Sequence, residues 1–259
     1  MLTFVIARSE ATWQSMDCFV LLAMTREEIS SMNEFRGQKV LGIVVAMPEE
    51  FDAVLATLDR PKKVEHGGRT FYCQGNICVI NSGVGQIDAA SATEALLWFV
   101  RHQGGEVQKI LNVGVVGALN KNLKVGQALV VEKVVHYDFD ISAGWDRKVG
   151  EYSDGRIFFP TDVTLAENLD EEIQLATLAS GDKFLAEPEK INQIVEQFGA
   201  DICDMEGAAV VRVADRHGVP VAMVKTVSDG GDCSEFDANV LSAIDNLKRI
   251  LKIILKEWK

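Results

Sequence analysis

Acidic side chains stand at the ends of apolar segments at three places in this chain. Asp204 and Glu206 flank Met205 directly before a run that is typical of a buried helix. Asp229 follows an apolar strand expected at 219–227, and Glu50 follows another expected at 40–46. A carboxylate that is removed from water loses much solvation free energy unless it is paired, hydrogen-bonded or used by a ligand. These positions predict one acid-lined pocket, in which carboxylates can serve as general acid and general base.

Two glycine turns follow expected strands. Ser82 and Gly83 begin the first, Ser-Gly-Val-Gly at 82–85, and Gly-Val-Val-Gly at 114–117 is the second. Either alone is most simply a turn, because glycine is the common turn residue. Two of them along one sheet indicate a ligand at the strand ends. Neither turn carries a P-loop lysine or a complete dinucleotide fingerprint, which disfavours nucleoside triphosphate and NAD binding.

Strand and helix patterns alternate along the chain after Met32. This alternation predicts an α/β fold, a single domain with a mixed, twisted central β-sheet flanked by helices. Phe71 to Cys73 and Ile77 to Asn81 are expected to pair as a hairpin across Gly75-Asn76. Strands are expected at 40–46, 71–73, 77–81, 109–113, 128–135, 173–179 and 219–227, and helices at 49–58, 86–100, 188–197, 206–217 and 238–258.

Composition narrows the class of protein. The chain has 259 residues, of which 47% are hydrophobic, and a formal net charge of -12 at pH 7. This length is ordinary for one domain, and the acidic balance argues against a nucleic-acid surface. The cysteines form no CxxC pair and the histidines have no ligand spacing, so the sequence favours a reducing cytoplasm and predicts neither a catalytic metal nor a cofactor. They are Cys18, Cys73, Cys78, Cys203 and Cys233, and His66, His102, His136 and His217.

Residues 1–31 are expected to lie outside the core fold. Their two apolar runs are interrupted by Arg8, Glu10 and Asp17 and are shorter than the ~20 residues of a membrane span. The order of basic and apolar residues also differs from that of a signal peptide. We interpret the segment as an extension, with Met32 as the start of a catalytic domain at 32–259. The alternative is a genuine extra helix that packs on the domain.

Several ordered motifs resemble those of the 5′-methylthioadenosine/S-adenosylhomocysteine nucleosidases, which belong to the nucleoside phosphorylase superfamily. The resemblance runs from about Val40 to the C-terminus, and the order of the motifs is more specific than any one of them. The motifs are Ala-Met-Pro-Glu-Glu at 46–50, Asn-Ser-Gly-Val-Gly at 81–85, Asn-Val-Gly-Val-Val-Gly-Ala-Leu at 112–119, Leu-Lys-Val-Gly at 123–126, Ser-Gly-Asp-Lys-Phe at 180–184, Asp-Met-Glu-Gly at 204–207 and Val-Ser-Asp at 227–229.

The resemblance implies a role for each of these acids. Cleavage of an N-ribosidic bond needs a protonated purine, a stabilised ribosyl cation and a directed water. The family's general acid, which protonates the purine at N7, falls on Asp229, with Ser228 orienting it. We expect a partly desolvated pocket to raise the pKa of Asp229 for this purpose. The water-activating carboxylate falls on Glu50, and the partner of the ribose hydroxyls falls on Glu206, beside a Met205 that packs on the sugar.

The resemblance also implies how the base is bound. Phe184 matches the aromatic residue that stacks on adenine, and the backbone at Leu185 matches the segment that reads the base edge. Asp204 stands where many bacterial members have Glu, and Lys225 where many have Arg, so substrate preference is less secure than reaction type. Asp182 is left outside the catalytic set, because an acid in Ser-Gly-Asp can close an Asx-turn.

Three functions remain open at this stage. The first is a hydrolase that cleaves methylthioadenosine and S-adenosylhomocysteine with water to release adenine, a methionine salvage reaction. The second is a purine nucleoside phosphorylase or a futalosine-type nucleosidase, although the acids at 46–50 disfavour phosphate. The third is a non-catalytic nucleoside-binding relative, which the retained acids disfavour. The expected partner is a small purine nucleoside, with neither nucleic acid nor membrane, and the resemblance implies a homodimer.

Overall fold

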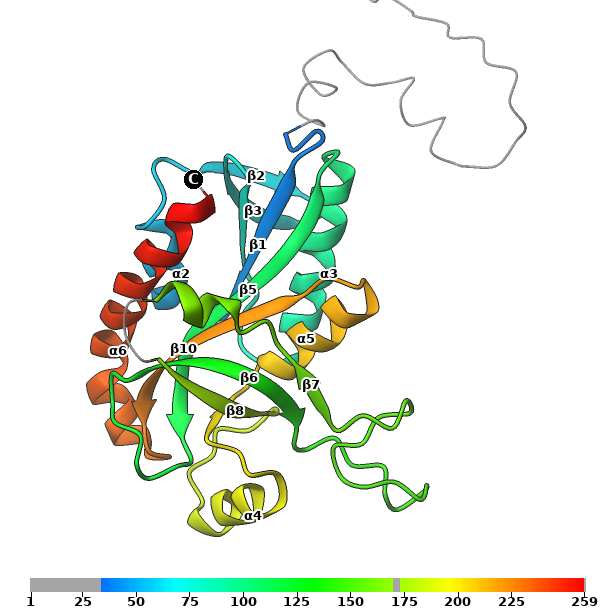
Figure 1. Ribbon diagram of the computed structural model, residues 1–259, viewed down its shortest axis with the longest axis vertical. Helices are drawn as coiled ribbons and strands as arrows, with labels where there is room; N and C mark the ends of the chain where they lie inside the picture. The colour runs from blue at the N-terminus through cyan, green and yellow to red at the C-terminus, as the bar shows by residue number, and fades with distance from the viewer. Residues whose placement is uncertain (1–33, 170–172, 259) are drawn as a thin grey trace, which may run out of the picture.

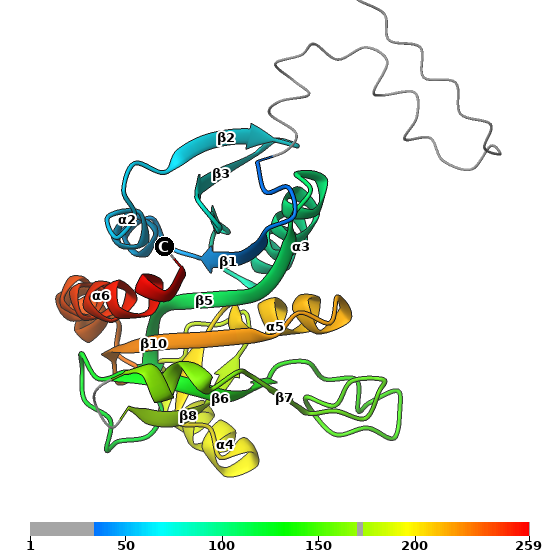
Figure 2. The same cartoon turned by 45° about the horizontal axis from the view of Figure 1, so that its top comes forward.

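The computed structural model describes residues 34–169 and 173–258. They form one α/β domain with a mixed central β-sheet between helices, which confirms the predicted fold class (Figures 1 and 2). The expected extension at 1–31 lies outside the described residues. Within those residues, no helix is both long and apolar enough to cross a membrane.

The sheet combines parallel and antiparallel neighbours. β1 pairs in parallel with β4 and β5, whereas β2, β3 and β4 form antiparallel hairpins. The strand order is β10-β6-β8-β9-β5-β1-β4-β3-β2, with β7 paired to β6. The strands are β1 (Lys39–Val45), β2 (Lys62–His66), β3 (Arg69–Gln74), β4 (Ile77–Asn81), β5 (Glu106–Ala118), β6 (Ala128–His136), β7 (Phe158–Pro160), β8 (Gln174–Ser180), β9 (Ile202–Asp204) and β10 (Val221–Asp229).

The long strand β5 closes part of the sheet on itself. Its 13 residues pair with β1 and β10, and its last two residues, Gly117 and Ala118, pair with β9. Since β9 continues through β8 and β6 back to β10, five strands form a closed ring. Gly117 lies opposite both Cys203 and Asp229, so this closure brings the ends of β9 and β10 to one place.

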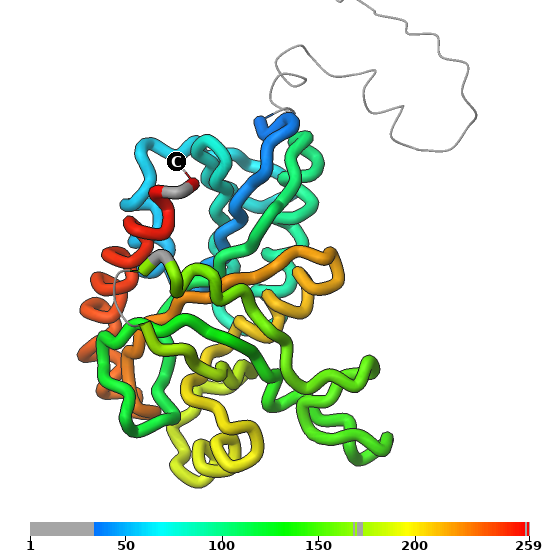
Figure 3. The backbone as a smooth tube through the Cα atoms, viewed as in Figure 1, coloured from blue at the N-terminus to red at the C-terminus, as the bar shows by residue number. Residues whose placement is uncertain are grey.

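Helices cover both faces of the sheet. The cluster that includes Phe99 and Val210 packs α3 and α5 on one face, and the cluster that includes Val54 and Leu247 packs α2 and α6 on the other (Figure 2). Residues 137–157, between β6 and β7, project away from the domain (Figure 3). The helices are α2 (Pro48–Leu55), α3 (Gln86–His102), α4 (Pro188–Phe198), α5 (Gly207–Arg216) and α6 (Cys233–Ile254), with 3-10 turns at η3 (Thr164–Asn168) and η4 (Leu255–Trp258).

The predicted elements are present, with shifted ends and three omissions. The expected strand at 109–113 is longer, and the glycine turn predicted at 114–117 is wrong, because β5 continues through Gly114 and Gly117. The helix expected at 238–258 begins earlier, at Cys233, where the Asp232 carboxylate accepts from the amides of Ser234 and Glu235. The omitted strands are the charged edge strand β2 and the three-residue strands β7 and β9, which carry too little periodicity to be recognised.

Candidate active site

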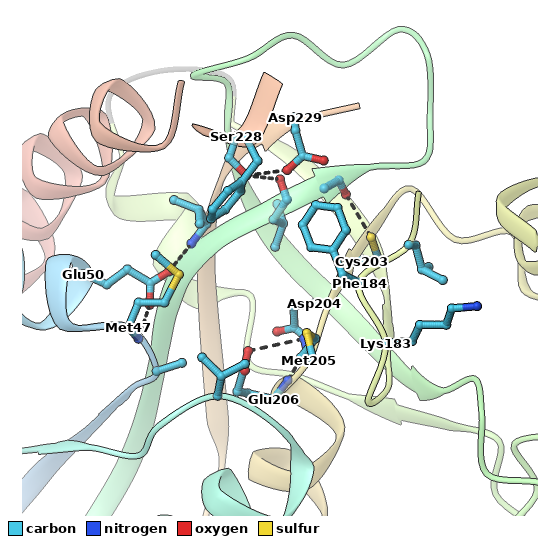
Figure 4. A pocket seen from close by; sticks show the side chains of 17 residues that line it. Met47, Glu50, Lys183, Phe184, Cys203, Asp204, Met205, Glu206, Ser228 and Asp229 are labelled. Carbon is cyan, nitrogen blue, oxygen red and sulfur yellow. Dashed lines mark hydrogen bonds between the residues drawn. The ribbon is translucent and has the colours of Figure 1, made fainter. Parts of the chain in front are cut away.

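One pocket gathers the ends of β5, β9 and β10, the start of α2 and the loop after β8. Its volume is about 200 Å³. Figure 4 shows Asp229 and Glu206 on opposite sides of this pocket and Glu50 on a third side. The lining residues are Ala46, Met47, Glu50, Val84, Val115, Val116, Gly117, Lys183, Phe184, Leu185, Cys203, Asp204, Met205, Glu206, Ser228, Asp229 and Phe236.

Glu50 is a buried carboxylate held by two backbone amides. It lies in the first turn of α2, where its Oε2 accepts from Met47 N at 3.0 Å. Its Oε1 accepts from Val115 N on β5 at 2.7 Å. A Cβ at Gly114 would lie 2.8 Å from Glu50 Oε1, so glycine there allows the carboxylate to approach the strand. Burial raises the pKa of Glu50, although both hydrogen bonds and the charge of Lys225 act in the opposite direction.

Asp204 and Lys225 form a buried ion pair beneath the pocket. Lys225 Nζ lies 2.8 Å from Asp204 Oδ2, and each side chain is only 2% exposed. Burial alone would raise the pKa of Asp204, but the Lys225 ammonium and the hydrogen bonds to the carboxylate outweigh it and hold that pKa below its usual range. Burial would lower the pKa of Lys225, and Asp204 keeps it raised. The pair is therefore ionised at neutral pH.

Glu206 lies at the junction between β9 and α5, where it is the N-cap residue of the helix. Its Oε1 accepts from Gly85 N at 2.9 Å, and its Oε2 accepts from Met205 N at 3.3 Å. Burial, followed by the charge of Asp204, raises the pKa of Glu206 to about 7, although Lys225 and the Gly85 hydrogen bond oppose this. Glu206 can therefore change its ionisation near neutral pH.

Asp229 ends β10 and is buried. Ser228 Oγ donates to Asp229 Oδ2 at 2.8 Å, and Gly231 N donates to Oδ1 at 2.8 Å. A Cβ at Gly117 would lie 3.3 Å from Asp229 Oδ1 and 3.0 Å from the Cys203 sulfur, so glycine leaves room for both at the closure of the sheet. The carboxylate is thereby oriented from both oxygens at the pocket wall (Figure 4).

An apolar wall faces these acids. Phe184 is 40% exposed and contacts Phe236 edge to face, with ring centroids 5.9 Å apart. Leu185 is buried beside it, and Met205 lies between the acids of 204 and 206. An exposed ring at a pocket mouth can stack on a flat aromatic ligand, because every heterocyclic base presents a π-face.

The structure brings most of the predicted site residues together. Glu50, Asp204 and Glu206 share the pocket with Asp229 and the other predicted lining residues, whereas Ser82 and Gly83 lie outside its lining. Ser82 is buried, and its Oγ bonds to the carbonyl oxygens of Val45 and Gly83. The predicted residues that do line the pocket are Glu50, Phe184, Leu185, Asp204, Met205, Glu206, Ser228 and Asp229.

Sequence reasoning missed several contributors. Asp182 accepts from Gln86 N at 2.7 Å at the start of α3, so it caps a helix instead of closing only a local turn. Cys203 and Phe236 line the pocket, but no local motif distinguishes them. In the sequence, Lys225 stands out only as a departure from a family pattern. An isolated lysine inside an apolar strand is the signal that could have identified it as the partner of a buried acid.

Three acids of the pocket share one buried cation. One buried cation, Lys225, serves three nearby acids, so Asp204 is paired while Glu50 and Glu206 have raised pKa values. Among the described residues, no group of three or more His, Cys, Asp or Glu side chains could hold a metal ion. Carboxylates in different states around one apolar-walled cavity can divide acid and base roles.

Comparison with known proteins assigns the family. A model of the phosphorylase superfamily matches residues 40–256. The chain is 30% identical over 228 residues to an aminodeoxyfutalosine nucleosidase of Campylobacter jejuni, covering 83% of this chain and 96% of that protein. It is 28% identical over 235 residues to a 5′-methylthioadenosine/S-adenosylhomocysteine nucleosidase of Maridesulfovibrio salexigens, covering 84% and 99%.

A solved structure shares the fold. The 5′-methylthioadenosine/S-adenosylhomocysteine nucleosidase of Helicobacter pylori with butyl-thio-DADMe-Immucillin-A matches with a TM-score of 0.77 at 29% identity, covering 85% of this chain and 98% of that chain. The resemblance seen in the sequence motifs is thus confirmed. The chain belongs to the phosphorylase superfamily, and it is an enzyme of the N-glycosyl hydrolase class.

Proposed function

We propose that this enzyme hydrolyses the N-glycosidic bond of adenine nucleosides that carry a 5′ thioether, namely methylthioadenosine and S-adenosylhomocysteine. The observation that carries the proposal is the convergence of Glu50, Glu206 and Asp229 on one cavity with an aromatic wall. Relatives named for these two substrates support the substrate class. The proposed role is a methionine salvage step in the cytoplasm. We also propose that the enzyme is a homodimer, which analytical ultracentrifugation can test.

In the proposed reaction, Asp229 donates a proton to the purine while the bond between the purine nitrogen and the anomeric carbon of the ribose breaks. Ser228 Oγ, 2.8 Å from Asp229 Oδ2, orients the acid. Glu50 accepts a proton from a water whose oxygen forms the new bond to that carbon, so free base and ribose leave. Glu206 accepts from the ribose hydroxyls and favours the positive charge that develops on the sugar. Phe184 stacks on the base, and Met205 packs on the sugar.

The charges of the pocket favour water over phosphate as the attacking group. Phosphorolysis needs free cations or several amides aimed at the phosphate oxygens. Here Lys225 is already paired with Asp204, and Lys183 Nζ lies 2.8 Å from Glu187. The buried carboxylate of Glu50 uses the amides of Met47 and Val115. A phosphate at this position would meet negative charge.

A second candidate substrate is aminodeoxyfutalosine, because a relative of this name covers most of the chain. Both candidate substrates would be hydrolysed by the same acids. They differ in the group at the 5′ position of the sugar, which lies at the opposite end from the base. Apart from Phe184, which is assigned to the base, the pocket is also lined by the apolar side chains of Val84 and Phe236, which favours the thioether as the first candidate.

The test is to incubate the protein with each nucleoside, with and without phosphate, and to measure the free base and the sugar by chromatography. We expect adenine from methylthioadenosine at a rate independent of phosphate, with an unphosphorylated sugar. Faster turnover of aminodeoxyfutalosine would favour the second candidate, and phosphorylated sugar would refute hydrolysis. Glu50→Gln should abolish turnover, while Glu49→Gln, an exposed neighbour in the same helical turn, is the matched control.

A further inference from the structure

Helix α5 begins at the active site, and side chains from three other elements accept its first amides. The first N–H groups of a helix have no partner within it, so their bonds must come from elsewhere. One of the acceptors, Gln86, comes from the first turn of α3. The bonds are Glu206 N and Gly207 N to Asp204 Oδ1 at 3.2 and 3.0 Å, Ala208 N to Ser180 Oγ at 2.9 Å, and Ala209 N to Gln86 Oε1 at 2.7 Å.

Helix α5 in turn supplies an acceptor to the start of α3. Gly85 precedes α3, and its N–H donates to Glu206 Oε1 at 2.9 Å. Gln86 therefore caps α5, while Glu206, the N-cap residue of α5, accepts from the start of α3. We call this pair of contacts the reciprocal cap. It joins the N-termini of two helices at the carboxylate that the proposed function assigns to the ribose.

The Gln86 side chain is buried in the protein interior and does not reach the pocket. It is 7% exposed and does not line the cavity. Its amide uses both ends, because Nε2 donates to Ser180 Oγ at 2.9 Å while Oε1 accepts from Ala209. Any effect of Gln86 on a ligand must act through another residue, and the nearest candidate is Glu206, which the start of α3 contacts directly.

We propose that Gln86 is a positioning residue for the reaction: by tying the first turn of α3 to the first turn of α5, it keeps the Gly85 amide within hydrogen-bond distance of Glu206. This inference rests on the proposed role of Glu206. An apolar side chain of the same length would leave the Ala209 N–H without its acceptor and would remove one of the two donors to Ser180 Oγ, so the two helix ends would separate. Glu206 would then lose its contact with Gly85.

Loss of the bond from Gly85 to Glu206 should shift the pKa of Glu206 in one direction, which a pH profile can detect. A hydrogen bond to a carboxylate favours its charged form, so loss of the Gly85 bond raises the pKa of Glu206 further. The charged groups that face Glu206 from the surrounding elements are Asp204 of β9, Lys225 of β10 and Glu50 of α2. All three remain in a Gln86 variant, as does Asp182, which holds Gln86 N. The shift can therefore be assigned to the reciprocal cap.

The experiment compares Gln86→Met with Gln103→Met in kcat/KM for methylthioadenosine between pH 5 and 9. Gln103 is a matched control, since it is buried at the other end of α3 and its Oε1 accepts from Glu34 N. We expect the acidic limb of Gln86→Met to move up by roughly one pH unit, with about a tenfold loss of kcat/KM below neutral pH. Gln103→Met should keep the wild-type limb.

An unchanged limb in Gln86→Met, or an equal shift in both variants, would overturn the inference. If Gln86→Met does not fold, Gln86→Asn keeps a neutral amide and shortens the side chain by one methylene, which weakens the bond from Ala209 N without adding a charge. This variant should fold and should also raise the limb, and a wild-type profile would refute the role. A wild-type enzyme that releases no base refutes the proposed function instead, so the two failures are distinguishable.

Discussion

The two ends of helix α5 carry ionic clusters of opposite character. At its N-terminus, Glu206 and the pair of Asp204 with Lys225 are buried at the pocket. At its C-terminal end, Asp215 joins Arg156 and Asp154 of the projecting segment on the surface. Arg156 lies 2.6 Å from Asp215 and 2.8 Å from Asp154, and its side chain is 41% exposed. The residue types are similar, and their solvation is not.

Solvation produces opposite pKa shifts at the two ends. Hydrogen bonds from Arg156 lower the pKa of Asp154 to about 2, because water leaves little desolvation to oppose them. Burial raises the pKa of Glu206 to about 7, because Lys225 is engaged by Asp204 and only partly compensates a second acid. An exposed acid beside arginine stays charged, and a buried acid that shares its cation titrates near neutral pH. The surface cluster is thus suited to tying a loop to a helix, and the buried cluster to acid-base chemistry.

The largest expected effect comes from removing a pocket acid and a surface acid by the same change. Asp229→Asn should lower kcat by about 10²–10⁴, since it removes the proposed proton donor and keeps the shape. Asp154→Asn should leave kcat unchanged. Steady-state turnover of methylthioadenosine measures both, and near-full activity of Asp229→Asn would show that the acid is misassigned.

The second test removes the cation from each cluster. Lys225→Met leaves Asp204 buried without a counter-charge and should cost about 3–5 kcal/mol in the free energy of unfolding. Arg156→Met should change it little, because water solvates the remaining acids. Urea unfolding measures both variants. The double variant Asp204→Asn/Lys225→Met should recover part of the loss, and equal effects at the two ends would contradict the contrast drawn from solvation.

The third test uses pH, for which the two ends have opposite signs. Glu206 has a folded pKa of about 7 against an ordinary 4.5, so its contribution to stability is present below pH 4.5 and is lost as pH rises through 7. Asp154 has a folded pKa of about 2 against 3.8, so its contribution is present above pH 3.8 and is lost as pH falls through 2.

Urea unfolding at pH 5 and pH 8 checks the sign for Glu206. Wild type should lose stability between these pH values relative to Glu206→Gln, whose side chain does not titrate. Asp154→Asn should run parallel to wild type over the same interval. A wild-type protein that gains stability relative to Glu206→Gln on going to pH 8 would show that the carboxylate is not protonated in the folded state.

The smallest effect is expected from deleting residues 1–31. Both ends of α5 and every candidate site residue lie later in the chain, and the family match begins at residue 40. A chain beginning at Met32 should therefore keep its activity and its melting temperature. Were the segment a true packing element, burial of its large apolar residues would contribute about 1.5–3 kcal/mol per side chain. Insolubility, or a melting temperature many degrees lower, would place the segment in the fold.

Much of the site was predictable because its acids follow apolar strands. The strand ending at Asp229 and the helix beginning after Glu206 are visible in local periodicity, and parallel strands present their carboxyl ends at one edge of a sheet. The order of the motifs specified the superfamily for the same reason. Each motif is a short local feature whose residue types are explained by its own backbone and its own chemistry.

Other features depended on contacts that no local pattern encodes. Strand β9 has three residues and exists because the end of β5 reaches it, which closes the sheet beside Asp229. In the sequence, Lys225 is only a departure from a family pattern. The structure shows that β10 holds its Nζ 2.8 Å from Asp204 Oδ2. Gln86 read as an ordinary first residue of a helix, and its acceptor role depends on Ala209, 123 positions later.

The physical reason is that secondary-structure propensity is a local property of the chain, whereas the partners of a buried side chain come from distant segments. Hydrophobic periodicity and turn chemistry act over a few residues, so the sequence alone determined which segments are strands or helices and where acids meet their ends. The pKa of a buried carboxylate depends on which cation and which amides reach it, and these come from distant segments. Only the tertiary structure decided that Asp204 pairs with the lysine and that Glu206 changes its ionisation near neutral pH.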